Sequence, residues 1–171
     1  MSTSSYVHVR VYNPDGSALT SSTACYASNG GCDLNLSIAT TGVYSVVVTP
    51  YNGAQTMSFR ATLPTDLPGT LTPNVPQTLA LSRRGQNGRL TFAGETGGTV
   101  ALQVTDQATA PAGERVYYYV YRPDGTLLTS TYTTSTATLT LANLPATGTY
   151  TVFADPRYGV ASTAQLTLAT P

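Results

Sequence analysis

Few residues in this chain could carry acid–base or nucleophilic chemistry. The sequence has one histidine, His8, and no lysine, and its 8 acidic residues are scattered, mostly in turns. Most general bases and Ser/His/Asp arrangements use histidine, and a glycosidase needs two carboxylates that face one cleft. His8 lies in a segment that alternates with valines, and the alternation directs it away from their side. We therefore expect no catalytic residue and no cofactor.

Two cysteines, Cys25 and Cys32, enclose a short loop that contains Asn29-Gly30-Gly31. This loop can fold back and bring the thiols together, and a disulfide here would contribute about 2–3 kcal/mol in the chain-entropy model. The alternatives are two free thiols or half of a zinc site, although the spacing does not suit zinc and only His8 could add a ligand. A disulfide would imply an oxidising compartment, so we expect an extracellular or cell-surface location.

An aromatic run, Val116-Tyr117-Tyr118-Tyr119-Val120-Tyr121, is the best candidate for ligand binding. In a β-strand, Tyr117, Tyr119 and Tyr121 share one face. If the valines point inward, these rings line an outer face, where they could stack on sugars and hydrogen-bond through their hydroxyls. The alternative is that they make cross-strand pairs on a solvated or inter-unit face.

The elements that would position these residues are short strands. Apolar residues alternate with polar ones in runs bounded by Gly, Pro, Asn or Asp, which is the pattern of half-buried strands, and about fourteen are expected. The fold class is therefore all-β. The alternating sets lie at 6–12, 43–49, 57–63, 79–81, 90–92, 100–104, 116–120, 139–141, 150–154 and 166–168.

An internal repeat divides the chain into tandem units. The segment 11–16, Val-Tyr-Asn-Pro-Asp-Gly, returns at 120–125 as Val-Tyr-Arg-Pro-Asp-Gly, and Thr-Gly-Val-Tyr at 41–44 returns at 147–150 as Thr-Gly-Thr-Tyr. Two copies in register indicate a tandem array of β units.

The two copies differ in length. The second, residues 67–171, includes opening strands before Arg115 that the first, residues 1–66, lacks. The sequence thus predicts two tandem antiparallel β-sandwich units, jelly-roll or immunoglobulin-like, of which the first is incomplete. A sheet without its partner strands exposes backbone groups and an apolar face. We expect unit one to need a preceding segment, unit two or another chain.

The repeated motifs indicate structural roles. In each turn, proline fixes φ, aspartate bonds nearby backbone and glycine takes positive φ. A calcium ligand is the alternative, but one carboxylate per turn falls short of a calcium loop, so no metal is expected. The turn residues are Pro14, Asp15, Gly16, Pro123, Asp124 and Gly125. Tyr44 and Tyr150 are expected in the core, each with its hydroxyl bonded to nearby backbone as in a tyrosine corner.

Composition excludes two classes of partner. The net charge is zero, charged residues are 9% of the chain, and its 8 basic residues, all arginine, are scattered except for Arg83-Arg84 with Arg89. Nucleic-acid binding needs a basic cluster, so this one is expected to be a solvated loop. No run approaches the roughly 20 apolar residues of a membrane span. The first residues have no signal-peptide pattern, which favours either a piece of a longer protein or another export route.

Four motifs carry a resemblance to a known family. They are the repeated Val-Tyr-x-Pro-Asp-Gly, the stretch at 81–94, Leu-Pro-Ala-Thr-Gly-Thr-Tyr-Thr-Val at 144–152, and Pro-Arg-Tyr-Gly at 156–159. Together they resemble the bacterial pre-peptidase C-terminal domain and related tandem β modules of large secreted or surface proteins with YD/RHS-type repeats. The resemblance covers nearly all of 67–168, and 9–63 as a partial copy.

The resemblance implies a jelly-roll-like β-sandwich that has no catalytic activity of its own and accompanies secreted peptidases and other exported proteins. Some family members bind calcium, collagen or polysaccharide, but their calcium-binding acidic residues have no clear match here. We therefore expect a non-catalytic spacer, scaffold or adhesion module of a larger exported bacterial protein. Its expected partners are neighbouring domains of a longer chain and polysaccharide or a cell-surface protein. The alternative is a carbohydrate-binding module that uses the tyrosine stripe.

Overall fold

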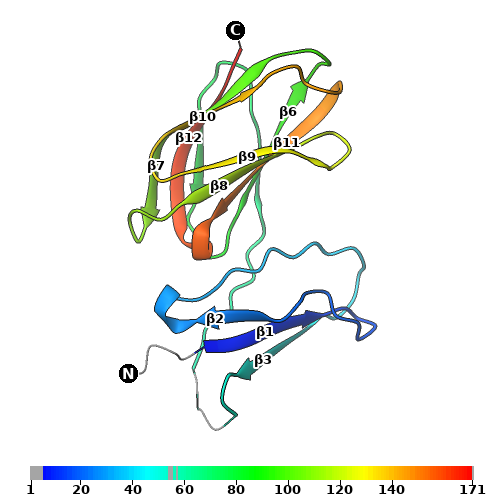
Figure 1. Cartoon of the computed structure of the whole chain (residues 1–171), viewed down its shortest axis with the longest axis vertical. Coiled ribbons are helices and arrows are strands. Elements are labelled where there is room, and N and C mark those ends of the chain that lie inside the picture. The colour runs from blue at the N-terminus through cyan, green and yellow to red at the C-terminus, as the bar shows by residue number, and fades with distance from the viewer. Residues whose placement is uncertain (1–5, 54–55, 57, 171) are drawn as a thin grey trace. The chain divides into compact units, whose positions relative to one another are not determined.

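The computed structural model describes residues 6–53, 56 and 58–170. The chain divides into two compact units, Met1–Ala61 and Thr62–Pro171 (Figure 1). Within the described residues the regular structure is β-strand, apart from two 3-10 turns, η1 (Ala27–Asn29) and η2 (Arg157–Gly159). The all-β class that the alternation predicted is confirmed.

Unit one contains one antiparallel sheet in the order β2-β1-β3, formed by β1 (Tyr6–Tyr12), β2 (Thr23–Tyr26) and β3 (Ser45–Pro50). β1 forms because valines at every second position share one face while polar and aromatic residues take the other. Val7 and Val11 are buried accordingly. β3 lies at the sheet edge, and in the described part of the chain β1 is its one strand neighbour.

Unit two holds the other strands in two sheets, one in the order β10-β7-β12-β5 and one in the order β4-β6-β11-β8-β9. Neighbouring strands run antiparallel, except for the parallel pair β4 and β6. The bounds are β4 (Leu67–Thr70), β5 (Gln77–Leu81), β6 (Gly88–Gly94), β7 (Val100–Ala110), β8 (Val116–Tyr121), β9 (Leu127–Thr133), β10 (Ala137–Leu141), β11 (Gly148–Pro156) and β12 (Ala161–Ala169).

The two sheets of unit two share one hydrophobic core. Leu102 and Leu166 enter it from the four-stranded sheet, and Phe92 and Tyr118 enter it from the five-stranded sheet. All four side chains are fully buried. Two sheets that bury their inner faces against each other make a β-sandwich. Because successive residues of a strand point to opposite faces, each strand also presents a second set of side chains outward.

The strand content departs from the sequence prediction in one segment. The described residues form twelve strands rather than about fourteen. The strand predicted over 57–63 is wrong in its described part: Met57 lies outside the described residues, and 58–63 have no regular secondary structure. Phe59 and Leu63 are 64% and 89% exposed. Alternation makes a strand only where a neighbouring strand accepts its backbone hydrogen bonds.

Candidate binding site: an aromatic face on unit two

β8 places Tyr117, Tyr119 and Tyr121 on the outer face of the five-stranded sheet, because the intervening residues are buried in the core. The Tyr117 and Tyr119 ring centroids are 6.3 Å apart, with 19° between the ring planes. Those of Tyr119 and Tyr121 are 6.5 Å apart, at 32°. These spacings follow the two-residue repeat of a strand, about 6.7 Å, so the rings form a row along β8.

Two more aromatic residues extend this row onto neighbouring strands. Tyr132 on β9 pairs with Tyr117, and their ring centroids are 5.6 Å apart. Phe153 on β11 pairs with Tyr119, at 6.4 Å between centroids. Sequence reasoning missed both residues, because the register between strands decides which side chains meet. We call Tyr117, Tyr119, Tyr121, Tyr132 and Phe153 the aromatic face.

Arginine side chains border the aromatic face at two places. The Arg115 guanidinium lies 4.4 Å from the Tyr132 ring centroid, and the Arg89 guanidinium lies 4.8 Å from that of Phe153. Both contacts are cation–π interactions. Arg89 also donates through Nε to the Asp66 carboxylate at 2.9 Å. Phe153 is 8% exposed, so the surface of the aromatic face is contributed chiefly by the four tyrosines.

Tyr119 has a perturbed hydroxyl. Partial burial raises its pKa above the ordinary value of 10.0, and the charge of Asp155 and the neighbouring Tyr117 and Tyr121 raise the pKa further. The phenol therefore stays protonated at neutral pH, where it can donate a hydrogen bond. The aromatic face thus combines flat apolar rings with hydroxyl donors, a combination that suits a polyhydroxylated ligand.

Other chemistry finds little support in the described residues. No group of three or more His, Cys, Asp or Glu side chains among them is arranged to hold a metal ion. Among the same residues, no helix has the length and apolar character that a bilayer crossing needs.

Comparison with solved structures gives weak similarities at 10% identity. No protein-family model matches the sequence, and no curated protein matches it. Among solved structures, the pre-peptidase C-terminal domain of collagenase from Bacillus anthracis has a TM-score of 0.44 and 10% identity, over 63% of this chain and 99% of that one. PliG from Aeromonas hydrophila, a periplasmic inhibitor of g-type lysozyme, has a TM-score of 0.37 and 10% identity, over 60% and 98%.

A pre-peptidase C-terminal domain is among the solved structures similar to this chain. The resemblance to tandem modules of YD/RHS-repeat proteins stays a prediction. The β-sandwich assignment itself rests on the strand pairing of unit two.

The predicted turn residues have the same local geometry in both units. Asp15 Oδ1 accepts hydrogen bonds from the Ser17 amide at 2.9 Å and the Ser17 hydroxyl at 2.6 Å. Asp124 Oδ1 accepts the corresponding bonds from Thr126 at 2.8 and 2.6 Å. These hydrogen bonds lower the pKa of both carboxyl groups. Each aspartate therefore stabilises its own turn.

A glycine contact joins each turn to the following tyrosine motif. A Cβ on Gly42 would lie 2.5 Å from Pro14 Cγ, and a Cβ on Gly148 would lie 2.8 Å from Pro123 Cγ. A side chain at either glycine would collide with the proline. The repeated Pro-Asp-Gly and Gly-x-Tyr motifs therefore recur together because they pack together.

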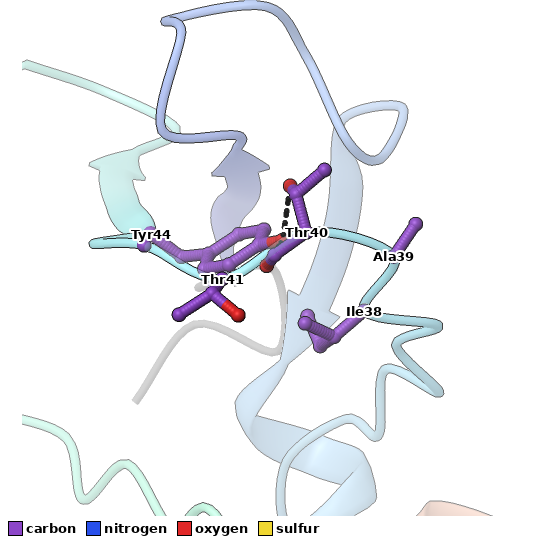
Figure 2. Close-up of a pocket in the computed structure, with 6 residues that line it drawn as sticks. Ile38, Ala39, Thr40, Thr41 and Tyr44 are labelled. Carbon is purple, nitrogen blue, oxygen red and sulfur yellow. Dashed lines mark hydrogen bonds between the residues drawn. The ribbon is translucent and has the colours of Figure 1, made fainter.

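The two predicted core tyrosines make the same hydroxyl bond in different surroundings. Tyr150 donates to the Ala146 carbonyl at 2.7 Å, and Tyr44 donates to the Thr40 carbonyl at 2.7 Å. Tyr150 is fully buried. Tyr44 is only half-buried, so its predicted core position is wrong. Figure 2 shows its ring beside Thr40, and both residues line a shallow depression in unit one together with Ile38.

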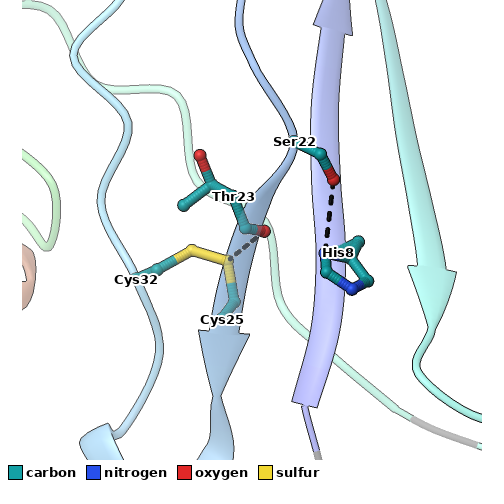
Figure 3. Close-up of a disulfide and its surroundings, with 5 residues drawn as sticks. All are labelled: His8, Ser22, Thr23, Cys25 and Cys32. Carbon is teal, nitrogen blue, oxygen red and sulfur yellow. Dashed lines mark hydrogen bonds between the residues drawn. A yellow bond between two sulfur atoms is a disulfide. The ribbon is translucent and has the colours of Figure 1, made fainter.

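The predicted pair of cysteines forms a disulfide in unit one. Cys25 lies on β2 and is buried, and Cys32 follows η1, with 5.0 Å between their Cα atoms (Figure 3). On the neighbouring β1, His8 Nδ1 lies 3.2 Å from the Ser22 hydroxyl. Both cysteines are bonded to each other, so neither is available as a zinc ligand or as a free thiol.

Proposed function

We propose that this chain is a non-catalytic β-sandwich module of a larger exported bacterial protein, and that it adheres to polysaccharide through the aromatic face. The observation that carries the proposal is the gathering of five aromatic side chains from β8, β9 and β11 on one outer sheet face. An outer face of a sheet is ordinarily covered by polar side chains. A contiguous aromatic surface is typical of an interaction site.

The chemistry of this surface favours a carbohydrate over an ionic partner. Tyr117, Tyr119 and Tyr121 offer ring faces to the apolar side of a sugar and hydroxyl groups to its polar edge. Charged residues are 9% of the chain and the net charge is zero, so long-range attraction of a charged partner is weak. Arg89 and Arg115 are already engaged with aromatic rings.

Export is supported by the Cys25–Cys32 disulfide. Disulfides persist in oxidising compartments and are rare in the cytosol. The proposed setting is therefore outside the cell or at its surface, where polysaccharide and cell-surface proteins are accessible.

A second candidate function is that of a structural spacer or scaffold that positions neighbouring domains of a longer chain. The internal repeat favours it, because tandem β units extend a polypeptide by a fixed increment. On this alternative the tyrosines make only cross-strand pairs, each contributing roughly 0.2–1 kcal/mol to the sheet.

Retention by polysaccharide distinguishes the two functions. Affinity electrophoresis and titration calorimetry against a glycan panel should detect binding by the full chain. Tyr119→Ala and Tyr121→Ala should each weaken it roughly 2- to 13-fold, because an aromatic contact contributes about 0.5–1.5 kcal/mol beyond its buried area.

The matched control is Val75→Ala, which shortens an apolar side chain that is 53% exposed in a loop. It should leave binding unchanged. Equal retention of the wild-type chain and both tyrosine variants would contradict the proposed use of the aromatic face. A wild-type chain that binds no glycan would leave the spacer as the supported function.

A further inference from the structure

The environment of Tyr150 shows what a complete tyrosine corner contains in this chain. Its ring stacks on Phe92 of β6, with centroids 5.2 Å apart and 16° between the planes. Gly94, at the end of β6, lies so close that a Cβ would be 2.8 Å from Tyr150 Cε2 and 2.7 Å from Leu144 Cδ1. β6 therefore closes one side of the corner with an aromatic ring and a glycine.

The same place in unit one has no such strand among the described residues. The repeat aligns Ile38 with Leu144 and Tyr44 with Tyr150. Leu144 is 2% exposed, whereas Ile38 is 55% exposed. Ile38, Thr40 and Tyr44 line the depression in Figure 2. This depression is thus the place that Phe92 and Gly94 of β6 fill in unit two.

The backbone of β3 is oriented to receive a strand on this side. The Tyr51 amide donates to the Tyr6 carbonyl at 3.2 Å, which directs the backbone groups of Tyr51 toward β1. Because these groups alternate in direction along a strand, those of Val46 and Val48 face the outer edge. In unit two, the Arg157 amide donates to the Arg115 carbonyl at 2.9 Å. The same alternation directs the Val152 backbone toward β6.

The side chains of β3 are also exposed on this side. Val46 is 59% exposed, whereas the corresponding Val152 is fully buried at 0% and pairs with Leu90 of β6. Val11, which pairs with Val46 across the sheet, is already buried at 3%. On the apolar face of unit one, Val11 of the central strand is therefore covered, whereas Val46 at the outer edge of β3 is not.

We infer that β3 accepts an added antiparallel strand of the β6 type, supplied by another β unit of the same kind. Its register follows from β6 and β11, where Leu90, Phe92 and Gly94 pair with Val152, Tyr150 and Gly148. The incoming strand therefore places a large apolar residue opposite Val46, an aromatic residue opposite Tyr44 and a glycine opposite Gly42. Strand addition to a sheet edge takes its affinity from main-chain hydrogen bonds and its specificity from alternate side chains.

The occupant is defined by this chain's own sequence. β6 of unit two is paired on both sides, by β4 and β11, and its Leu90 and Phe92 are in the core of unit two. It is therefore committed to its own sandwich, and a second copy of this chain has its β6 committed in the same way. The inference rests on the proposed function in this respect: the strand that fits is supplied by a further β unit of the proposed larger protein, and not by β6 of this chain.

A labelled peptide with the sequence of residues 87–95 tests the inference by fluorescence anisotropy on the full chain. Saturable binding is expected, and a peptide with Leu90→Ser and Phe92→Ser should not bind. Val46→Lys should weaken binding about tenfold or more, because it places a charge opposite the buried apolar residue. The matched control is Val47→Lys, on the opposite face of β3 and 45% exposed, which should bind as the wild type does.

A second test joins the added strand covalently to the chain, so that its result does not depend on the affinity of the free peptide. Residues 67–114 are duplicated and joined directly ahead of Tyr6, because the repeat aligns Tyr6 with Arg115. Hydrogen exchange at the Val46 and Val48 amides should then slow markedly relative to the native chain. Slowed exchange supports the inference even without peptide binding.

Three results would overturn it. If hydrogen exchange at the Val46 and Val48 amides is unchanged and the peptide does not bind, β3 does not accept an added strand. Equal binding of the serine-substituted peptide, or binding indifferent to Val46→Lys, removes the proposed register. A concentration-dependent dimer that Val46→Lys abolishes assigns the β3 edge to a second copy of the chain instead.

Discussion

Removing one hydroxyl group from unit two tests whether its tyrosine corner supports the sandwich. Tyr150→Phe keeps the buried ring stacked on Phe92 but removes two hydrogen bonds, one to the Ala146 carbonyl at 2.7 Å and one from the Ala146 amide at 3.2 Å. Leaving partly buried backbone groups without these bonds costs about 1–2 kcal/mol. For a domain of this size the unfolding midpoint should fall by roughly 5–10 °C.

Differential scanning calorimetry measures the effect, with Tyr44→Phe as the matched control. Tyr44 makes the same 2.7 Å bond to a backbone carbonyl, but in unit one and with a half-buried ring. Its substitution should leave the transition of unit two in place. A Tyr150→Phe midpoint within one degree of the wild type would refute the argument, as would a Tyr44→Phe variant that shifts the same transition.

Three further outcomes follow from contacts described above. Gly94→Ala should destabilise unit two by about 1–3 kcal/mol in chemical denaturation, because its new Cβ would lie 2.7 Å from a core leucine; unaltered stability would contradict that packing. Reduction of Cys25–Cys32 should lower the melting midpoint of unit one, since the short loop contributes about 2–3 kcal/mol; an unmoved midpoint would count against it. The lowered pKa values of Asp15 and Asp124 mean that their turns are stabilised above about pH 4, the unfolded pKa, and lose this as the pH falls through the folded values. NMR titrations that place the pKa values of both carboxyl groups near the unfolded value would disprove this.

Much of the candidate site follows from local pattern. Alternation along β8 is enough to direct Tyr117, Tyr119 and Tyr121 to one face, because the two-residue period is a property of the strand itself. The spacing of Cys25 and Cys32 likewise favours a disulfide over half of a zinc site. Such inferences succeed because they depend on residues close together in the chain.

The remainder depends on contacts between distant segments. Tyr132 and Phe153 join the aromatic face only through the register of β9 and β11 on β8, which no local pattern specifies. Phe59 belongs to an alternating segment, but the described residues offer no strand that pairs with it. Tyr44 repeats the motif of Tyr150, but among the described residues of unit one no strand equivalent to β6 packs against it. In each case the local sequence favours one structure, and contacts with a neighbouring element determine whether that structure forms.

The disulfide of unit one has a consequence for how the protein matures. Among the described residues of unit one, the buried hydrophobic side chains are Val7, Val11 and Cys25. Small domains with so little core commonly depend on covalent cross-links. The Cys25–Cys32 disulfide therefore gives unit one part of the stability that a second sheet gives unit two. The two halves of the chain should consequently differ in their response to the redox state of the compartment: unit two should be indifferent to it, and unit one should reach its full stability only once the disulfide has formed.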